Sequence, residues 1–554
     1  MITRTLIRMA ALNGLWFIWK SILIRRSRRL PTVGTGLILA AGPFACARGH
    51  AFGQRFDLPI PLNYYLAGAA GAVFFSFVLL AIFARAPMER GAPYPRFNLL
   101  RWRAVGYLTH PWLLAALRLF VALLFLLILA AGLFGAQDPR HNLLPTMVWI
   151  IWWTGMAYVC ALIGDLWALV NPWNTLFGWA ESLYGYFSGG RRELALNLRY
   201  PSRLGVWPAC VFFAFFVWGE LIWTGNAVPA DLAVAAIVYS AVTWVGMLLF
   251  GRETWLRKGE AFSLAFGMLA RVAPTEIRVD PGAAGTEVCE RCREHEDGVN
   301  CYECFGRVAP QYREWNLRPF GAGLLVGNAV SISMMFFVVL LLSTVSFDGF
   351  MGTSLWVYDI QGALPDWRAL RPFLFMMEMS GISREVVIST AGLCLFPILF
   401  AGAYLSMAWI MSATARFSRD GNAMSAIDIA AFFVFSLLPI ALAYHLAHYL
   451  SFLLTVGQLV IPLASDPFGL GWDLFGTAHY RLNIGLVGAL FVWYTSVISI
   501  VVGHVIAVCI GHLLAFRVLR DRKSVLVSQV PMLALMIFYT VFSLWILAQP
   551  LIEA

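Results

Sequence analysis

Charged residues are scarce in this sequence. Asp, Glu, Lys and Arg make up 13% of the 554 residues and hydrophobic residues 60%, whereas about 25% charged residues is usual in soluble proteins. This composition excludes an ordinary soluble domain and predicts an all-α, polytopic membrane protein surrounded by lipid bilayer. The net charge of +10 is typical of positive residues gathered in cytoplasmic loops. No DNA- or RNA-binding motif is present, so we expect no nucleic-acid partner.

Two further patterns are missing from the sequence. No internal repeat divides the chain into similar halves, which disfavours, without excluding, a transporter built from inverted repeats. No H-x-H, H-x-x-E-H or H-E-x-x-H element occurs either. A two-metal hydrolytic site of the soluble type, which needs clustered His and carboxylate ligands, is therefore not indicated.

Ten hydrophobic stretches are long enough to form the roughly 20-residue helices that cross a bilayer. Arg and Lys gather in alternate loops, most densely in 251–319. By the positive-inside rule those loops are cytoplasmic in a bacterial inner membrane, and the mature N-terminus and the C-terminus lie outside. The predicted spans are 64–85, 111–135, 146–170, 206–225, 230–250, 321–345, 385–412, 427–461, 485–516 and 526–549.

The N-terminal segment 1–49 has the pattern of a signal peptide or membrane anchor. A basic region precedes the short apolar stretch Thr32–Ala47, which ends in small residues, as secretory signals do. Cleavage after Gly49 would make His50 the new N-terminus, where its amine and imidazole could chelate copper. The alternatives are cleavage after Ala47, or an uncleaved anchor with His50 in a loop.

These features divide the remaining chain into three parts. We expect a first bundle of five spans in 50–272, a small cytoplasmic insertion in 273–319 and a second bundle of five spans in 320–554. The long loops 346–383 and 462–483 would lie outside.

Four cysteines form the best-defined motif. Cys289 and Cys292, then Cys301 and Cys304, make two C-x-x-C pairs separated by eight residues. Paired thiolates of this spacing suit tetrahedral zinc, and a cytoplasmic position favours a metal over disulfides. We expect a structural zinc site. An iron–sulfur cluster, or redox and regulatory thiol chemistry, is the alternative.

Two histidines, His445 and His448, lie within the eighth predicted span. Ionisable residues inside a membrane are costly and mark functional sites, and this spacing separates them by only roughly 4.5 Å along a helix. Both could therefore reach one metal or one polar cavity. His504 of the ninth span could complete the site or hold a haem, and Glu220 is an acid within the fourth span. The alternative is interhelical hydrogen bonding that only fixes packing.

Five blocks of the sequence carry a family resemblance. They are HAFGQRFDLPIPLNYYLAGA from His50, GDLWALVNPWNTLFGW from Gly164, STVSFDGFMGTSLW from Ser343, LPIALAYHLAHYLSFLL from Leu438 through ASDPFGLGWDLFGTA, and GHVIAVCIGHLLAFR from Gly503. They resemble a bacterial family of polytopic membrane proteins labelled fenitrothion hydrolase, over most of the chain after residue 50. The resemblance implies hydrolysis of an organophosphate triester by a membrane-bound enzyme, with or without a second membrane or periplasmic subunit.

Three hypotheses remain open from the sequence. The first is a metal-dependent membrane hydrolase, in which the three histidines hold the metal and Glu220 or a loop aspartate (Asp348, Asp466 or Asp473) is the base. The second is a transporter of a metal ion or small solute that uses the same histidines as ligands or proton relay. The third is a membrane subunit of a redox complex, with haem at the histidines and iron at the cysteines.

Overall fold

The computed structural model of the protein describes residues 58–83, 94–189, 193–280, 300–325, 330–416, 424–518 and 522–552. All of these belong to one unit within Gly49–Ala554. The predicted signal or anchor segment 1–49 lies outside the described residues, as do His50, Cys289 and Cys292.

The described residues contain ten helices or helical runs long and apolar enough to cross a membrane. Their number confirms the prediction of a polytopic helix bundle. They are α2 (Leu62–Phe83), α4 (Pro111–Phe134), the run Leu143–Leu162, the run Ser202–Leu221 that ends with α9 (Trp207–Leu221), α10 (Pro229–Phe250), α15 (Ile332–Met351), Arg384–Thr414 of α17 (Arg384–Arg416), the run Ala426–Ser465, α21 (Ala489–Val518) and Lys523–Gln549 of α22 (Arg522–Ile552).

Shorter helices connect the spans or lie at their ends. They are α3 (Arg103–Leu108), α7 (Leu166–Val170), α8 (Pro172–Phe187), α11 (Arg252–Lys258), α12 (Ala261–Leu269), α14 (Tyr302–Arg307) and α16 (Arg371–Met379). Side-chain caps fix where several of these begin. At the start of α8, for example, the side-chain oxygen of Asn171 accepts a hydrogen bond from the backbone N–H of Asn174. Pro172 is in the first turn of this helix, where its lack of a backbone N–H leaves no donor without a partner.

A small antiparallel sheet interrupts the helical architecture. Its order is β1-β3-β2, formed by β1 (Phe97–Asn98), β3 (Arg313–Leu317) and β2 (Thr275–Val279). Leu317 pairs with both Phe97 and Thr275, which sets the register. The sequence prediction contained no sheet. Two of these strands lie in the predicted insertion 273–319, and the third follows the first span.

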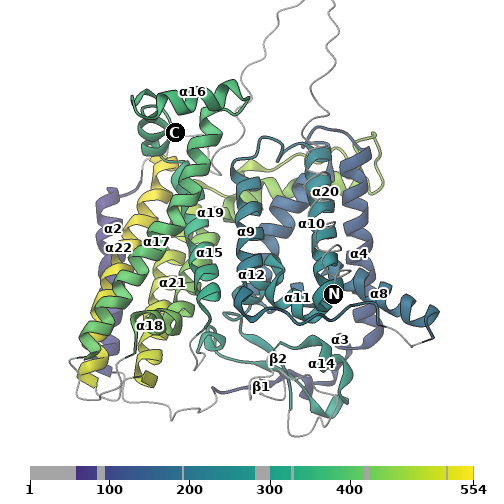
Figure 1. Ribbon diagram of the computed structural model, residues 1–554, viewed down its shortest axis with the longest axis horizontal. Helices are drawn as coiled ribbons and strands as arrows, with labels where there is room; N and C mark the ends of the chain where they lie inside the picture. The colour runs from purple at the N-terminus through teal and green to yellow at the C-terminus, as the bar shows by residue number, and fades with distance from the viewer. Residues whose placement is uncertain are drawn as a thin grey trace, which may run out of the picture. The chain divides into compact units, whose positions relative to one another are not determined.

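Two groups of helices meet along α15 and the middle of the eighth span, helix α19 (Leu438–Thr455) (Figure 1). In one group α2 and α17 pack against α22, and α21 packs against α2, α19 and α22. In the other group α4 packs against α10 and α8, and α12 packs against α9. Helix α15 contacts both α9 and α19, so side chains from both groups converge there.

The third and the eighth spans each consist of several helical segments. The third consists of α5 (Leu143–Pro145), a π-helix η2 (Thr146–Gly155) and α6 (Met156–Leu162). The eighth consists of α18 (Ala426–Phe433), the 3₁₀ turn η9 (Val434–Leu437), α19, the turn η10 (Val456–Leu459) and α20 (Val460–Ser465). Pro439 lies in the first turn of α19, directly after η9, because proline cannot donate the hydrogen bond that a continuous helix requires. Short π segments often occur at functional sites.

The spans differ in how much lipid they meet. The most apolar windows of the eighth span and of α15 are 83% and 72% buried, whereas that of α4 is 11% buried. Polar residues on α15 and α19 are therefore surrounded by protein, where they can find hydrogen-bond partners that lipid cannot offer.

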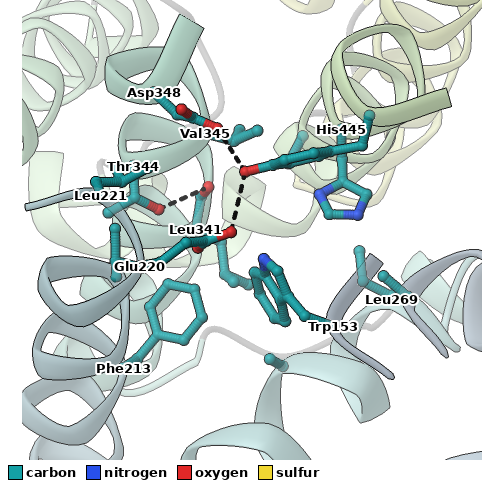
Figure 2. Close-up of a pocket in the computed structure, with 15 residues that line it drawn as sticks. Trp153, Phe213, Glu220, Leu221, Leu269, Leu341, Thr344, Val345, Asp348 and His445 are labelled. Carbon is teal, nitrogen blue, oxygen red and sulfur yellow. Dashed lines mark hydrogen bonds between the residues drawn. The ribbon is translucent and has the colours of Figure 1, made fainter. Parts of the chain in front are cut away.

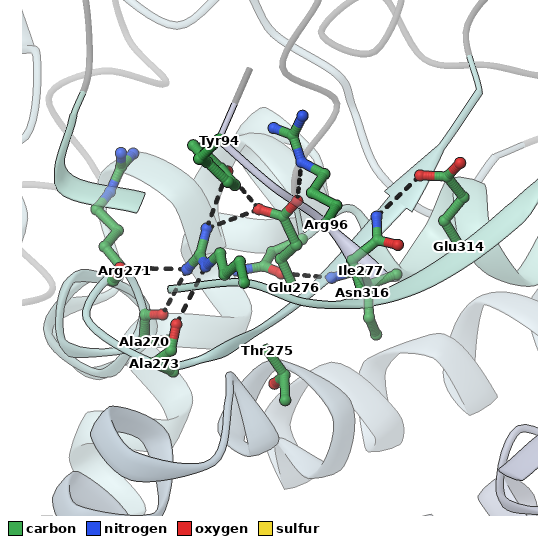
Figure 3. A network of polar contacts seen from close by, with 12 residues as sticks. Tyr94, Arg96, Ala270, Arg271, Ala273, Thr275, Glu276, Ile277, Glu314 and Asn316 are labelled. Atoms are coloured by element: carbon green, nitrogen blue, oxygen red, sulfur yellow. Dashed lines mark hydrogen bonds and ion pairs between the residues drawn. The ribbon is translucent and has the colours of Figure 1, made fainter. Parts of the chain in front are cut away.

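A buried ion-pair network fastens the sheet to the helices (Figure 3). Glu276 on β2 contacts Arg318 at 2.7 Å and Arg96 at 2.6 Å, and it accepts a hydrogen bond from Tyr94. The Arg318 guanidinium also donates to carbonyls of the segment that follows α12, namely those of Ala270, Arg271 and Ala273. A cation at the end of a helix is stabilised by the helix dipole.

Candidate intramembrane polar site

Asp348 lies inside the membrane bundle and not in a loop. The sequence predicted a sixth span at 321–345, which placed Asp348 in the following outer loop. Helix α15 instead runs from Ile332 to Met351, and Ser331 caps its start by accepting the N–H of Met334. The span therefore begins about ten residues later than predicted, and the loop assignment of Asp348 was wrong.

The carboxylate of Asp348 is joined to two side chains of α19. Its Oδ2 accepts a hydrogen bond from the Tyr449 hydroxyl at 2.5 Å and lies 2.9 Å from Nε2 of His448. The Tyr449 hydroxyl also lies 3.4 Å from Oε1 of Glu220 (Figure 2). The four side chains thus form one continuous line, Glu220–Tyr449–Asp348–His448, which joins α9, α19 and α15.

The sequence of α19 explains why it contributes so many polar groups. His445 and Tyr449 are four residues apart, so they share one face of the helix. Tyr444 and His448 share the adjacent face for the same reason. Tyr444, His445 and Tyr449 are all buried, which shows that other helices cover both of these faces.

A small cavity lies beside this line of residues. Glu220, Asp348, His445, Tyr449 and Trp153 are among the side chains that line it. The space open to the centre of a water-sized molecule is about 40 Å³. A single water needs roughly 10–15 Å³ by this measure, so the cavity accommodates a few waters or a small ion.

His445 faces the cavity with one nitrogen available. The side chain is 93% buried, since only 7% of the residue is exposed, and its Nε2 has no hydrogen-bond partner among the described residues. The Trp153 ring, from the π-helix, stands edge-on to it with ring centroids 5.8 Å apart. The Tyr158 hydroxyl donates to the His445 carbonyl at 3.2 Å, which ties α6 to α19 at this level.

His504 occupies a different position from the other predicted intramembrane residues. The structure brings His445, His448 and Glu220 to one site, whereas Nδ1 of His504 contacts the Ile500 carbonyl and its ring lies against Tyr539. No group of three His, Cys, Asp or Glu side chains within the described ranges is arranged to hold a metal ion. The metal and haem assignments for the intramembrane histidines therefore stay predictions.

The described half of the four-cysteine motif is built into a small hydrophobic core. Cys301 and Cys304, at and after the start of α14, are 8% and 1% exposed. They pack with Val279 at the end of β2 and with Phe305. The Tyr302 hydroxyl donates to the carbonyl of Asp165, the N-cap residue of α7, and so joins α14 to the segment that follows the third span. The zinc site and its iron–sulfur alternative stay predictions, because Cys289 and Cys292 lie outside the described residues.

Sequence reasoning missed three contributors to the site: the intramembrane role of Asp348, and Tyr449 and Trp153 as partners. Two signals were available. Ser331 precedes an apolar run at the position of a helix N-cap, and Tyr449 stands four residues after His445. No sequence signal pointed to Trp153, because its position depends on the packing of the π-helix.

Comparison of the chain with protein-family models, curated proteins and solved structures finds no match. The resemblance to the fenitrothion hydrolase family therefore stays a prediction based on the five sequence blocks. A functional assignment depends on the chemistry of the site itself.

Proposed function

We propose that this protein is a membrane transporter that moves protons, and that Glu220, Tyr449, Asp348 and His448 form its proton-transfer line. The observation that supports the proposal is the continuous hydrogen-bonded sequence of titratable side chains across three helices. Chains of Asp, Glu and His inside a membrane are typical of proton relays in pumps and transporters.

The geometry allows proton transfer in a defined order. A hydroxyl has one proton, and Tyr449 donates it to Asp348 at 2.5 Å. When Glu220 carries a proton, it can donate to the Tyr449 oxygen as Tyr449 releases its own proton to Asp348. When the neutral His448 ring carries its hydrogen on Nδ1, Asp348 then passes the proton to the lone pair of Nε2, 2.9 Å away, and the ring becomes imidazolium. One proton enters at Glu220 and one arrives on His448, and Tyr449 ends neutral.

The site accommodates small species. A pocket that binds a drug-sized molecule usually measures about 300–1,000 Å³, far more than the space beside His445. Glu220 and Asp348 both lie near the carboxyl ends of their helices. With the inner-membrane orientation predicted from loop charges, in which both termini lie outside and the cysteine insertion is cytoplasmic, protons would enter from the outer side. The cargo coupled to them is a metal ion or a small solute.

Proton flux into liposomes tests the proposal. Purified protein is reconstituted with a trapped pH-sensitive dye, and a potassium gradient with valinomycin sets the membrane potential. We expect proton uptake in the wild type, and its loss in Glu220→Gln, Tyr449→Phe and Asp348→Asn. Asp138→Asn, in an exposed carboxylate–histidine pair, is the matched control. Wild-type flux no greater than that of empty liposomes would contradict the proposal.

A membrane-embedded hydrolase is the second candidate. The contact between Asp348 and His448 supports it, because a carboxylate that orients an imidazole is the arrangement found in general bases. The family resemblance suggests an organophosphate triester as substrate. Detergent-solubilised protein incubated with a chromogenic aryl phosphotriester should then release phenol without any vesicle, and His448→Gln should abolish the release. Proton flux without phenol release selects transport.

For the four-cysteine motif we propose a structural zinc site. Burial of Cys301 and Cys304 in a small core beside β2 supports it. Elemental analysis should find about one zinc per chain, lost in Cys301→Ser/Cys304→Ser and retained in His445→Ala/His448→Ala. Iron with a visible absorption spectrum would instead select the redox-subunit alternative.

A further inference from the structure

The cavity beside the Glu220–His448 line has a nitrogen on its wall that no described residue satisfies. His445 lines this cavity next to Trp153 (Figure 2), and only 7% of the residue is exposed. Its Nε2 has no hydrogen-bond partner among the described residues. Buried polar side-chain atoms are normally hydrogen-bonded in folded proteins. A group that enters the cavity would satisfy this nitrogen, so the cavity has a specific point of attachment for a ligand.

The unpartnered nitrogen of His445 is a hydrogen-bond acceptor. The backbone of Thr154, in the π-helix of the third span, accepts a hydrogen bond from the ring. Because Nε2 has no partner, Nδ1 is the nitrogen that makes this bond, and it therefore carries the hydrogen. Nε2 of the neutral ring then has the lone pair. The ligand that fits this nitrogen donates a hydrogen bond to it.

Negative charge dominates the wall of the cavity. Glu220 and Asp348 both line it, and its lining among the described residues includes no Lys or Arg. His448, 2.9 Å from Asp348, balances one negative charge when it is protonated. With both carboxylates ionised, one negative charge remains, and a buried charge without a counter-ion is costly. A monovalent cation in the cavity neutralises it.

The size of the cavity and the spacing of its polar groups narrow the choice of cation. The space of about 40 Å³ has room for about three water-sized groups. No group of three His, Cys, Asp or Glu side chains in the described part of the chain is arranged to hold a metal ion. Ligands of a metal such as zinc lie about 2.0–2.3 Å from it, whereas an N–H group reaches acceptors at about 2.7–3.2 Å. A small cation with several N–H groups therefore suits this wider spacing.

We propose that this cavity binds an ammonium-type cation, either ammonium itself or methylammonium. The cation donates one hydrogen bond to Nε2 of His445, and the carboxylates of Glu220 and Asp348 balance its charge. The inference rests on the proposed function in one respect, because it names this cation as the cargo that moves with the protons. Binding of the cation does not depend on that role, so the two can fail separately.

A comparison of ammonium with potassium tests the site. The two ions have the same charge and similar size, but potassium cannot donate a hydrogen bond. The full-length protein in detergent is titrated with each chloride salt by calorimetry at about pH 7, where His445 is to be neutral. Tetramethylammonium, which has no N–H group, keeps the ionic strength constant. We expect ammonium to bind at least about tenfold more tightly than potassium.

Three variants locate this preference. His445→Leu removes the acceptor, so the two dissociation constants should become equal within about twofold. His445→Gln keeps an acceptor near the position of Nε2 and should retain most of the preference. His141→Leu, in an exposed loop pair, is the matched control and should behave like the wild type. Each value is a ratio of two ions measured on one protein, so a general loss of stability does not alter it.

The outcomes separate the site from the proposed function. A wild type without preference for ammonium, or a His445→Leu variant that keeps it, would overturn the site whatever the proton flux. Preference for ammonium in a protein without proton flux would support the site and overturn the proposed function. Uptake of radiolabelled methylammonium into the liposomes tests the role as cargo. We expect uptake above that of empty liposomes in the wild type and its loss in His445→Leu, and equal uptake in these two proteins would overturn that role.

Discussion

Two of the buried polar networks of the protein, the sheet network around Arg318 and the membrane site around Asp348, satisfy their hydrogen-bonding groups differently. At the sheet, every N–H of the Arg318 guanidinium has an acceptor: the carbonyls of Ala270, Arg271 and Ala273, the Glu276 carboxylate and the Tyr94 hydroxyl. Glu276 in turn receives hydrogen bonds from three side chains. No proton in this network needs to move.

The membrane site is open by comparison. Tyr449 has one proton and two carboxylate neighbours, and Nε2 of His445 faces a cavity without a partner among the described residues. A closed network rigidifies the fold, whereas a partly satisfied one has alternative hydrogen-bonding states. From this difference we infer that burial alone is a poor guide to a candidate site, and that unsatisfied hydrogen-bonding capacity beside a cavity is a better one.

The largest expected difference between the two places is in stability. Glu276→Gln should lower the free energy of unfolding by about 3–5 kcal/mol, because it leaves the Arg318 charge buried without a counter-ion. Asp348→Asn should lower it by less, about 1 kcal/mol, while abolishing proton flux. Denaturant unfolding in detergent measures both. Equal losses of stability in the two variants would show that the membrane site is also a structural element.

The close approach of α21 to α19 provides the next test. A Cβ at Gly503 would clash with Ala443 and lie 2.7 Å from the Pro439 carbonyl, and this carbonyl is backbone that cannot move aside. Gly503→Ala should therefore lower the free energy of unfolding by about 1–3 kcal/mol and reduce proton flux, since it displaces α19, which carries His448 and Tyr449.

Gly511→Ala on the same helix is the matched control for Gly503→Ala. No atom lies within 4 Å of a Cβ built at Gly511, so this change should be neutral or add up to about 1 kcal/mol through helix propensity. Similar losses in both glycine variants would mean that helix propensity, and not the α19–α21 contact, governs the result.

Glu260 is intermediate between the closed and open sites. It accepts hydrogen bonds from the Tyr239 hydroxyl and the N–H groups of Phe262 and Ser263, at the start of α12. Burial raises the pKa of Glu260 above its ordinary value of 4.5, although these hydrogen bonds act in the opposite direction. A raised pKa in the folded state stabilises the protein below the unfolded-state pKa, and this contribution is lost as pH rises through the folded-state pKa.

Glu260→Gln should remove that pH dependence. The stability of the wild type relative to the variant should be greater at about pH 4 than at about pH 8. Unfolding curves for the two proteins across this range measure the difference. If the stability of the wild type relative to the variant is instead greater at about pH 8 than at about pH 4, the hydrogen-bond donors around Glu260, and not its burial, determine its pKa.

Much of this architecture was accessible from the sequence because it depends on local apolar length. To predict the ten spans, it was enough to find runs of about 20 apolar residues. The helical repeat alone was enough to place His445 and His448 on neighbouring faces of one helix. Asp348 was misplaced because the apolar residues before Ser331 resembled the start of a span, although the helix begins at its cap.

The rest depends on contacts between distant segments. Strand β1 has two residues and pairs with a strand more than 200 positions later, so no local pattern could indicate the sheet. From the sequence, His504 could complete the site of His445 and His448 or hold a haem, because it lies in the next span. Which way each helix is rotated decides that contact, and the rotation of α21, which places His504 against Tyr539, is set by packing that a single sequence does not encode locally.

The smallest expected effect comes from a second carboxylate–histidine pair, Asp138 and His141. Its atoms are 2.8 Å apart, nearly the separation of Asp348 and His448, but the side chains are 51% and 71% exposed, whereas those of the membrane pair are 16% and 12% exposed. The N–H of Arg140, and then His141, lower the pKa of Asp138. Its small contribution to stability is therefore present above the unfolded-state pKa and lost as pH falls through the folded-state pKa.

Solvent screens an exposed pair, so Asp138→Asn should change the free energy of unfolding by less than about 0.5 kcal/mol and leave proton flux unchanged. Because the two pairs share chemistry and distance, a loss of flux in Asp138→Asn comparable to that in Asp348→Asn would contradict the proposal that burial in the membrane gives the Asp348 pair its role in proton transfer.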